Sequence, residues 1–267
     1  MKNIKHYLIH WNIAGNNRKI DENIRKKVNT FKRFIDKAHH HNLSIVYCVN
    51  EINNNYVRHL QPNVLLQGLD KEVSGGIKKS NIFVCMKGLN DCLIAKSKVS
   101  YYFSRKSPFR YRVVLAKIKL EHNTIKILTF HSPIGSYENG NKSGSKVKAK
   151  FYAKILQIIK KEKPDIITMD ANEPKEYRHK FSNWKFHHNF YGNENIIEAQ
   201  AAFKFIDKHY KRIKSGPTYN AFHYDHIYFN LNTVNLIKTK KLNKFTRLHK
   251  SDHKPIVVEL IFKNELI

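Results

Sequence analysis

The sequence predicts a single mixed α/β domain in which buried β-strands deliver polar side chains to one rim of a sheet. Several apolar, β-branched runs stop at a carboxylate, an amide or an imidazole, which is typical of buried strands that end at a site. Stretches with helical periodicity lie between these runs. The 267 residues are ample for one large core, and no linker or repeat divides the chain. We therefore expect residues 1–267 to form one domain.

The first 51 residues have the pattern of a strand, a helix and a second strand. An apolar run ends at Asn12, and residues 43–49 form another run that leads to Glu51. Between them, residues 21–42 carry apolar side chains at steps of three and four, separated by basic residues. This order predicts a strand–helix–strand unit.

The middle of the chain predicts more strands and one further helix. Strands are expected over residues 80–86, 112–120, 124–130 and 165–169. The second and third are separated by a short turn and predict an antiparallel hairpin. Residues 147–161 predict a helix that Pro164 ends. The loop 135–144 is either a solvated connector or a substrate-facing segment, and residues 173–217 are less regular.

The charge balance of the chain favours a polyanionic partner. There are 49 Lys and Arg against 21 Asp and Glu, a net charge of +28. An AT-rich genome would enrich lysine, but it need not leave so few acids. Lysine and arginine side chains bind phosphate groups, so such a surplus favours a polyphosphate such as nucleic acid. A membrane surface is less favoured, because the sequence shows no basic amphipathic helix with a strong apolar face. The partner we expect is nucleic acid.

Other features of the composition narrow the class of protein. There is no apolar run of 18 residues and no signal segment, so we expect a cytoplasmic protein without a membrane span. The three cysteines, Cys48, Cys85 and Cys92, lack a CxxC spacing. This pattern favours ordinary thiols over a disulfide framework or a zinc site.

Residues that could hold a metal or move protons stand at the ends of the apolar runs or beside them. They are Asn12, Glu51, His131, Asp170, Asn172, Asp225, Asp252 and His253. Asp170 and Asn172 are two apart, so an extended backbone would present both on one side. The oxygen atoms of Asn12, Glu51 and Asp252 suit Mg²⁺ or Mn²⁺, and such an ion can polarise a phosphoryl oxygen. No cysteine or serine nucleophile is required.

Taken in order, these residues resemble the endonuclease/exonuclease/phosphatase superfamily, which includes deoxyribonuclease-I-like and abasic-site endonuclease-like enzymes. The most specific motif is Ser-Asp-His-Lys-Pro at 251–255, followed by the Asp-x-Asn pair at 170 and 172. The resemblance spans nearly the whole chain. It implies a four-layer α/β sandwich with two central, mostly antiparallel sheets and an active site at one rim.

The resemblance also implies catalytic roles. Asp170 would orient or deprotonate the attacking water, and Asn172 would bind the scissile phosphate. His253 would contact the phosphate or transfer protons, with Asp225 fixing its tautomer. His131 matches the family's other active-site histidine, although no acidic partner for it is evident in the sequence.

Basic residues near these motifs are candidates for substrate binding. The family often carries a phosphate-binding arginine where Arg112 opens the strand before His131, and Arg110 is an equal candidate by position. The lysines at 238–250, among them Lys240, Lys241 and Lys244, form either a solvated face or a phosphate-backbone track. In contrast, His10 and His226 are more typical of structural or exposed histidines than of catalytic ones.

These residues together predict a Mg²⁺- or Mn²⁺-dependent phosphodiesterase. We expect a nuclease, in particular a monomeric endonuclease acting on DNA rather than RNA. A phosphatase or phospholipase acting on a phosphorylated small molecule or lipid head group is the alternative within the same fold. A catalytically silent nucleic-acid-binding protein is disfavoured, because binding requires charge but not this set of acids and histidines.

Overall fold

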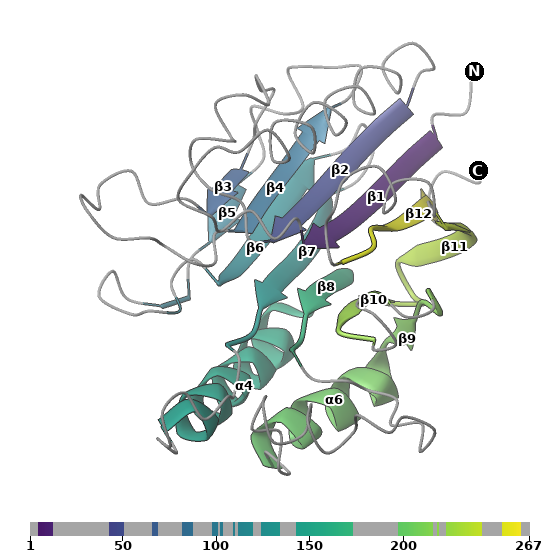
Figure 1. Cartoon of the computed structure of the whole chain (residues 1–267). Helices are drawn as coiled ribbons and strands as arrows, with labels where there is room; N and C mark the ends of the chain where they lie inside the picture. Colours follow the sequence, from purple (N-terminus) through teal and green to yellow (C-terminus); the bar gives the residue numbers. More distant parts are fainter. Residues whose placement is uncertain are drawn as a thin grey trace.

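In the computed structural model, two six-stranded β-sheets and two helices form the described part of the chain (Figure 1). The structure describes residues 5–12, 43–50, 66–68, 82–87, 98–100, 102–103, 109, 112–119, 124–133, 143–172, 197–215, 218, 223–241 and 253–262. Within these ranges, no helix combines the length and apolar character that crossing a bilayer requires.

The first sheet has the strand order β11-β12-β1-β2-β4-β3. Its strands are β1 (Lys5–Asn12), β2 (Leu43–Asn50), β3 (Leu66–Gly68), β4 (Ile82–Lys87), β11 (Val234–Lys241) and β12 (Ile256–Phe262). The β1 and β2 strands pair in parallel, whereas the other neighbours are antiparallel. A parallel pair needs a crossover connection. The helix expected there, over 21–42, lies outside the described residues.

The second sheet has the order β5-β6-β7-β8-β10-β9. Its strands are β5 (Lys98–Ser100), β6 (Val113–Lys119), β7 (Thr124–His131), β8 (Ile166–Asp170), β9 (Lys211–Arg212) and β10 (Asp225–Phe229). The predicted β6–β7 hairpin is confirmed by its antiparallel register. The β7 and β8 strands are parallel and are joined through helix α4 (Ser143–Glu162). The expectation of mostly antiparallel sheets therefore holds for the described strands.

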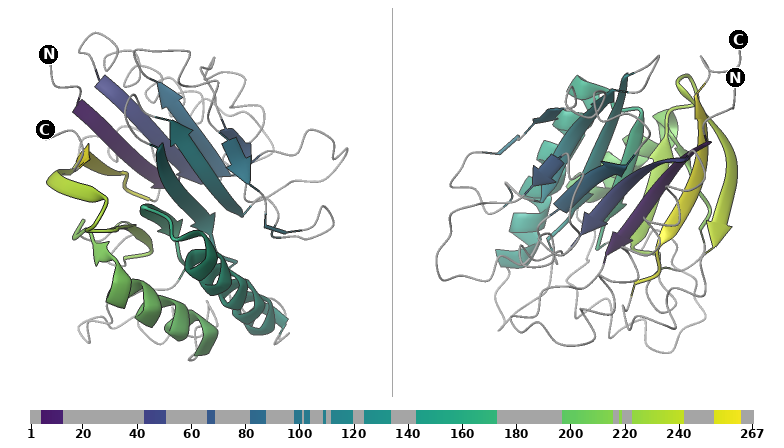
Figure 2. Two further views of the ribbon diagram at one scale, coloured as in Figure 1. Left: turned by 180° about the vertical axis from the view of Figure 1, so that it is seen from behind. Right: turned by 90° about the horizontal axis from the view of Figure 1, so that it is seen from above.

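The second sheet is covered on both faces, and this determines the burial of its strands. Val114 packs with Leu8 and Cys48 of the first sheet in a core between the sheets. The adjacent Val113 packs on the other face against Phe151 of α4. Figure 2 shows α4 and α6 on the side of the second sheet that faces away from the first. The described residues thus form three layers: the two helices, the second sheet and the first sheet. Neither of the two described helices covers the outer face of the first sheet.

The two helices differ from the sequence prediction in different ways. Helix α6 (Ile197–His209) lies in the region that lacked a clear pattern, and it buries Ala199, Ala202 and Ile206. Small alanines at a helical spacing give a weak apolar signal, so the sequence does not predict this helix. In addition, α4 begins at Ser143, so the last residues of the expected loop 135–144 belong to the helix.

Candidate active site

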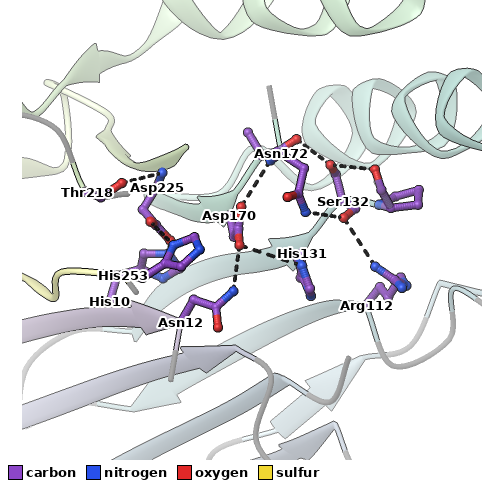
Figure 3. Close-up of polar contacts among 12 residues, drawn as sticks. His10, Asn12, Arg112, His131, Ser132, Asp170, Asn172, Thr218, Asp225 and His253 are labelled. Atoms are coloured by element: carbon purple, nitrogen blue, oxygen red, sulfur yellow. Dashed lines mark hydrogen bonds and ion pairs between the residues drawn. The ribbon is translucent and has the colours of Figure 1, made fainter. Parts of the chain in front are cut away.

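The candidate site lies at one rim of the two sheets, where three buried polar side chains stand in a row across neighbouring strands (Figure 3). His131 ends β7 and lies in parallel register with Asp170, which ends β8. Asp225 begins the antiparallel strand β10 and lies opposite Asp170. All three side chains are buried. Neighbouring residues in register share a face of a sheet, so the alignment of strand ends brings two acids and a histidine together.

The Asp225 carboxylate lies between two imidazoles. Its Oδ2 is 2.6 Å from Nδ1 of His253, and its Oδ1 is 3.3 Å from Nε2 of His10. Its backbone N–H donates to Oγ1 of Thr218 at 3.1 Å. Burial alone would raise the pKa of Asp225. The His253 charge and the hydrogen bonds from both histidines outweigh burial and hold this pKa well below its usual range. Asp225 is therefore an ionised acceptor.

Asp170 has the opposite electrostatic environment. Nδ2 of Asn12 donates to its Oδ2 at 2.7 Å, and the backbone N–H of Asn172 donates to its Oδ1 at 3.0 Å. Burial is the main cause that raises the pKa of Asp170, and the negative charge of Asp225 adds to it. Two neighbouring carboxyl groups whose pKa values are pushed apart can perform different acid–base roles.

His131 is a neutral histidine beside Asp170. Burial lowers its pKa well below the ordinary value, and the charges of Arg112 and His253 lower it further. Its Nε2 lies 3.7 Å from Oδ2 of Asp170, which is too long for a hydrogen bond. Asp170 is thus the nearby acid that was not evident from the sequence.

The backbone turns at Asn172, so the expectation that it continues an extended strand is wrong. Its φ of 44° is left-handed, a conformation that asparagine tolerates better than most residues. The hydrogen bond from its N–H to the Asp170 carboxylate stabilises this turn. Its side-chain Nδ2 donates to the carbonyl oxygen of Ser132 at 2.8 Å. Nη1 of Arg112 donates to the same carbonyl at 3.2 Å, which places the predicted arginine beside the site.

Lys148 is a residue of the site that the sequence analysis missed. It is fully buried on α4, and its Nζ donates to the carbonyl oxygen of Asn172 at 2.7 Å. One helical turn later, the hydroxyl of Tyr152 donates to the carbonyl oxygen of Ala171 at 2.7 Å. A lysine at helical spacing before the buried residues Tyr152 and Ile155 is the signal that could have revealed it.

The described part of the site contains a group of side chains that could hold a metal ion. Ligand atoms of Asp170, Asp225 and His253 lie within 4.8 Å of one another. Asp225, however, directs both oxygens at histidines, so we regard it as an orienting acid. The Asn12 amide donates through nitrogen, and its oxygen is the atom suited to Mg²⁺ or Mn²⁺. The other predicted ligands, Glu51 and Asp252, lie outside the described residues.

The predicted lysine track is described only in part. Lys240 and Lys241 end the edge strand β11, where they pair with Val257 and Ile256 of β12. Ile256 also pairs with His10, so the backbone of Lys241 lies level with the rim. Lys244 lies outside the described residues.

Several solved structures of nucleases and phosphatases have a similar architecture. An apurinic/apyrimidinic (AP) endonuclease from Archaeoglobus fulgidus matches with a TM-score of 0.62 at 14% identity, covering 96% of this chain and 99% of that one. An endonuclease/exonuclease/phosphatase from Bacteroides vulgatus gives 0.59 at 13%, covering 98% and 100%. The 3′ phosphatase NExo from Neisseria, bound to a product DNA hairpin, gives 0.60 at 13%, covering 96% and 99%.

These comparisons confirm the resemblance predicted from the sequence. The chain has the fold of the endonuclease/exonuclease/phosphatase superfamily, with two sheets in a mixed α/β arrangement. No protein-family model matches the sequence, and a comparison with curated proteins finds no match. At these identities the likeness establishes the fold, and the site residues must carry the argument about function.

Proposed function

We propose that this chain is a divalent-metal-dependent phosphoesterase that cleaves phosphodiester bonds in nucleic acid. The observation that carries the proposal is the pair of facing carboxyl groups at the rim. Asp225 is held ionised between two histidines, whereas burial raises the pKa of Asp170. A site that hydrolyses a phosphodiester can use this division between an orienting acid and a group that accepts a proton.

In the proposed reaction, Asp170 orients the attacking water and accepts its proton. Asp225 holds the Nδ1–H of His253, so the Nε2 atom of His253 faces the substrate phosphate. The Asn172 amide has two N–H donors and uses one on Ser132, so the second can donate to a phosphate oxygen. A bound Mg²⁺ or Mn²⁺, held by Asn12, Glu51 and Asp252, would stabilise charge on the phosphate.

The charge of the chain supports nucleic acid as the substrate. A surplus of 28 positive charges favours a polyanion over a small phosphate ester. The NExo structure was solved with product DNA. On this basis we propose DNA before RNA. We further propose internal cleavage before end trimming, and a monomer that acts in the cytoplasm, as the sequence led us to expect.

The test is hydrolysis by the purified protein with Mg²⁺, Mn²⁺ or excess EDTA. Substrates are circular DNA, end-labelled linear DNA, RNA, and the model esters bis(p-nitrophenyl) phosphate and p-nitrophenyl phosphate. We expect metal-dependent nicking of circular DNA, which Asp170→Asn abolishes. Cleavage of the monoester alone would favour a phosphatase, and release of end label alone an exonuclease. Absence of any metal-dependent hydrolysis would refute the proposal.

A further inference from the structure

We propose that His10 is a positioning residue of this site, which fixes the orientation and tautomer of His253 through the carboxylate of Asp225. The catalytic consequence rests on the proposed function, whereas the orienting role can be tested without it. Figure 3 shows His10 and His253 together at the Asp225 carboxylate. His10 is fully buried, so of the two expected alternatives, a structural or an exposed histidine, the structure excludes the exposed one.

The last three residues of β1 each contact a different part of the candidate site. His10 reaches the carboxylate of Asp225 at 3.3 Å, and Nδ2 of Asn12 donates to Asp170 at 2.7 Å. Nε1 of Trp11, between them, donates to the backbone oxygen of His253 at 3.1 Å. A single strand end of the first sheet thus holds two acids of the second sheet and the backbone of the histidine. In this arrangement, His10 is the residue of β1 that contacts the Asp225 carboxylate.

The direction of the hydrogen bonds follows from the charge of Asp225. An ionised carboxylate only accepts, so His10 donates through Nε2–H and His253 donates through Nδ1–H. The hydrogen bond from His10 to Oδ1 opposes rotation of the Asp225 carboxylate about its side-chain bond. The Oδ2 atom therefore stays aimed at Nδ1 of His253, and the Nε2 atom of His253 stays on the substrate side.

The contact depends on the reach of the His10 ring. Its Nε2 atom makes the bond, whereas its buried Nδ1 has no hydrogen-bond partner among the described residues. A glutamine amide nitrogen occupies roughly the place of Nε2, and an asparagine amide nitrogen roughly that of Nδ1. His10→Gln should therefore keep the donor, and His10→Asn should lose it. The two substitutions are chemically alike, so their difference isolates the hydrogen bond.

His226 provides a matched control. It follows Asp225 directly on β10 and is also buried, with 3% of its surface exposed. Its ring packs against Phe203 and Tyr228, on the face of the sheet opposite to the Asp225 carboxylate. His226→Leu removes a buried histidine of the same strand without touching the carboxylate.

The experiment compares His10→Gln, His10→Asn, His10→Leu and His226→Leu with the unmutated protein. One readout is kcat and KM for bis(p-nitrophenyl) phosphate with Mg²⁺ or Mn²⁺. The second is the ¹⁵N shift of the two ring nitrogens of His253 at one fixed pH, which reports the tautomer in the protein without substrate. Circular dichroism and thermal unfolding establish that each variant is folded.

We expect His10→Leu and His10→Asn to lower kcat by roughly 10- to 100-fold with little change in KM, the usual effect of losing an orienting contact. Both should move the His253 ring shifts away from the Nδ1–H tautomer. His10→Gln and His226→Leu should stay within about threefold in kcat and keep the shifts. Should His10→Leu fail to fold, the Gln and Asn pair decides alone.

Two results would overturn the inference. One is that His253 shows the same ring shifts in His10→Asn as in His10→Gln. The other is that His10→Asn and His10→Gln have equal kcat. If the unmutated protein hydrolyses nothing, the proposed function fails, and the ring shifts still decide whether His10 orients His253.

Discussion

Removing Asp225 and His253 separately and together tests whether they act as one unit. The 2.6 Å contact joins an ionised carboxylate to an imidazole, and both side chains are buried. A charge-assisted hydrogen bond of this kind contributes about 1.5–3 kcal/mol. Since about 1.4 kcal/mol corresponds to a tenfold change in rate, Asp225→Asn should lower turnover by roughly 10- to 100-fold. His253→Ala also removes the group that faces the phosphate and should lower it by roughly 10²-fold or more.

The double variant carries the decisive information. Residues that act as a unit fail together, so Asp225→Asn combined with His253→Ala should be little worse than His253→Ala alone. Single-turnover cleavage of labelled DNA, measured beside binding affinity, separates chemistry from binding. We expect affinity within about threefold of the unmutated protein, because basic residues elsewhere supply most phosphate contacts.

Asp165→Asn is the control for removing a half-buried acid next to the same sheet. Asp165 precedes β8 at the end opposite to the rim, and its Oδ2 accepts the backbone N–H of Lys126 at 2.7 Å. Its substitution should leave turnover unchanged. If the two site substitutions instead multiply their losses in the double variant, Asp225 does not act through His253 and the reasoning fails.

Three further outcomes follow from charge and burial. Excess EDTA should abolish hydrolysis, and Glu51→Gln should raise the metal concentration required; full activity in EDTA would contradict a metal site. Log affinity for DNA should fall steeply with log salt, and neutralising Lys240, Lys241 and Lys244 should flatten that slope. A flat slope in the unmutated protein would favour a small-molecule substrate. Burial raises the pKa of Cys48 from 9.0 to about 12. Above pH 9 the Cys48 thiol ionises in the unfolded chain but not in the folded one, which favours unfolding. The free energy of unfolding should therefore fall by roughly 1 kcal/mol per pH unit between about pH 9 and pH 12. Denaturant titrations of Cys48→Ala should show a smaller loss, and an identical loss would contradict this.

The strand ends of the site could be predicted because their signal is local. Apolar runs that lead to Asn12, His131 and Asp170 become β1, β7 and β8, and each strand ends at that residue, at most one position beyond the expected end. Their assembly could not be predicted in the same way, because register is a property of strand pairs. That Asp225 lies opposite Asp170 in β10 depends on the pairing of strands far apart in sequence.

The residues that were missed or misjudged act through non-local contacts. His10 looked like an ordinary histidine because its partner Asp225 is 215 positions away. Lys148 looked like one more lysine in a basic helix, and only the fold shows its ammonium group at the Asn172 carbonyl. The turn at Asn172 was mistaken for extended chain because a side-chain hydrogen bond, rather than a propensity, stabilises it.

The site and the core between the sheets depend on each other. His10 and Asn12 belong to the first sheet, whereas Asp170 and Asp225 belong to the second, so their contacts bridge the sheets. The same strands pack Leu8 against the second sheet deeper in the molecule. Protein interiors are close-packed. A shift of one sheet on the other would therefore disturb both the contacts at the rim and the core between the sheets. Because a displacement of about 1 Å can lower a rate by roughly 10²-fold, the packing between the sheets determines the geometry that the proposed chemistry requires.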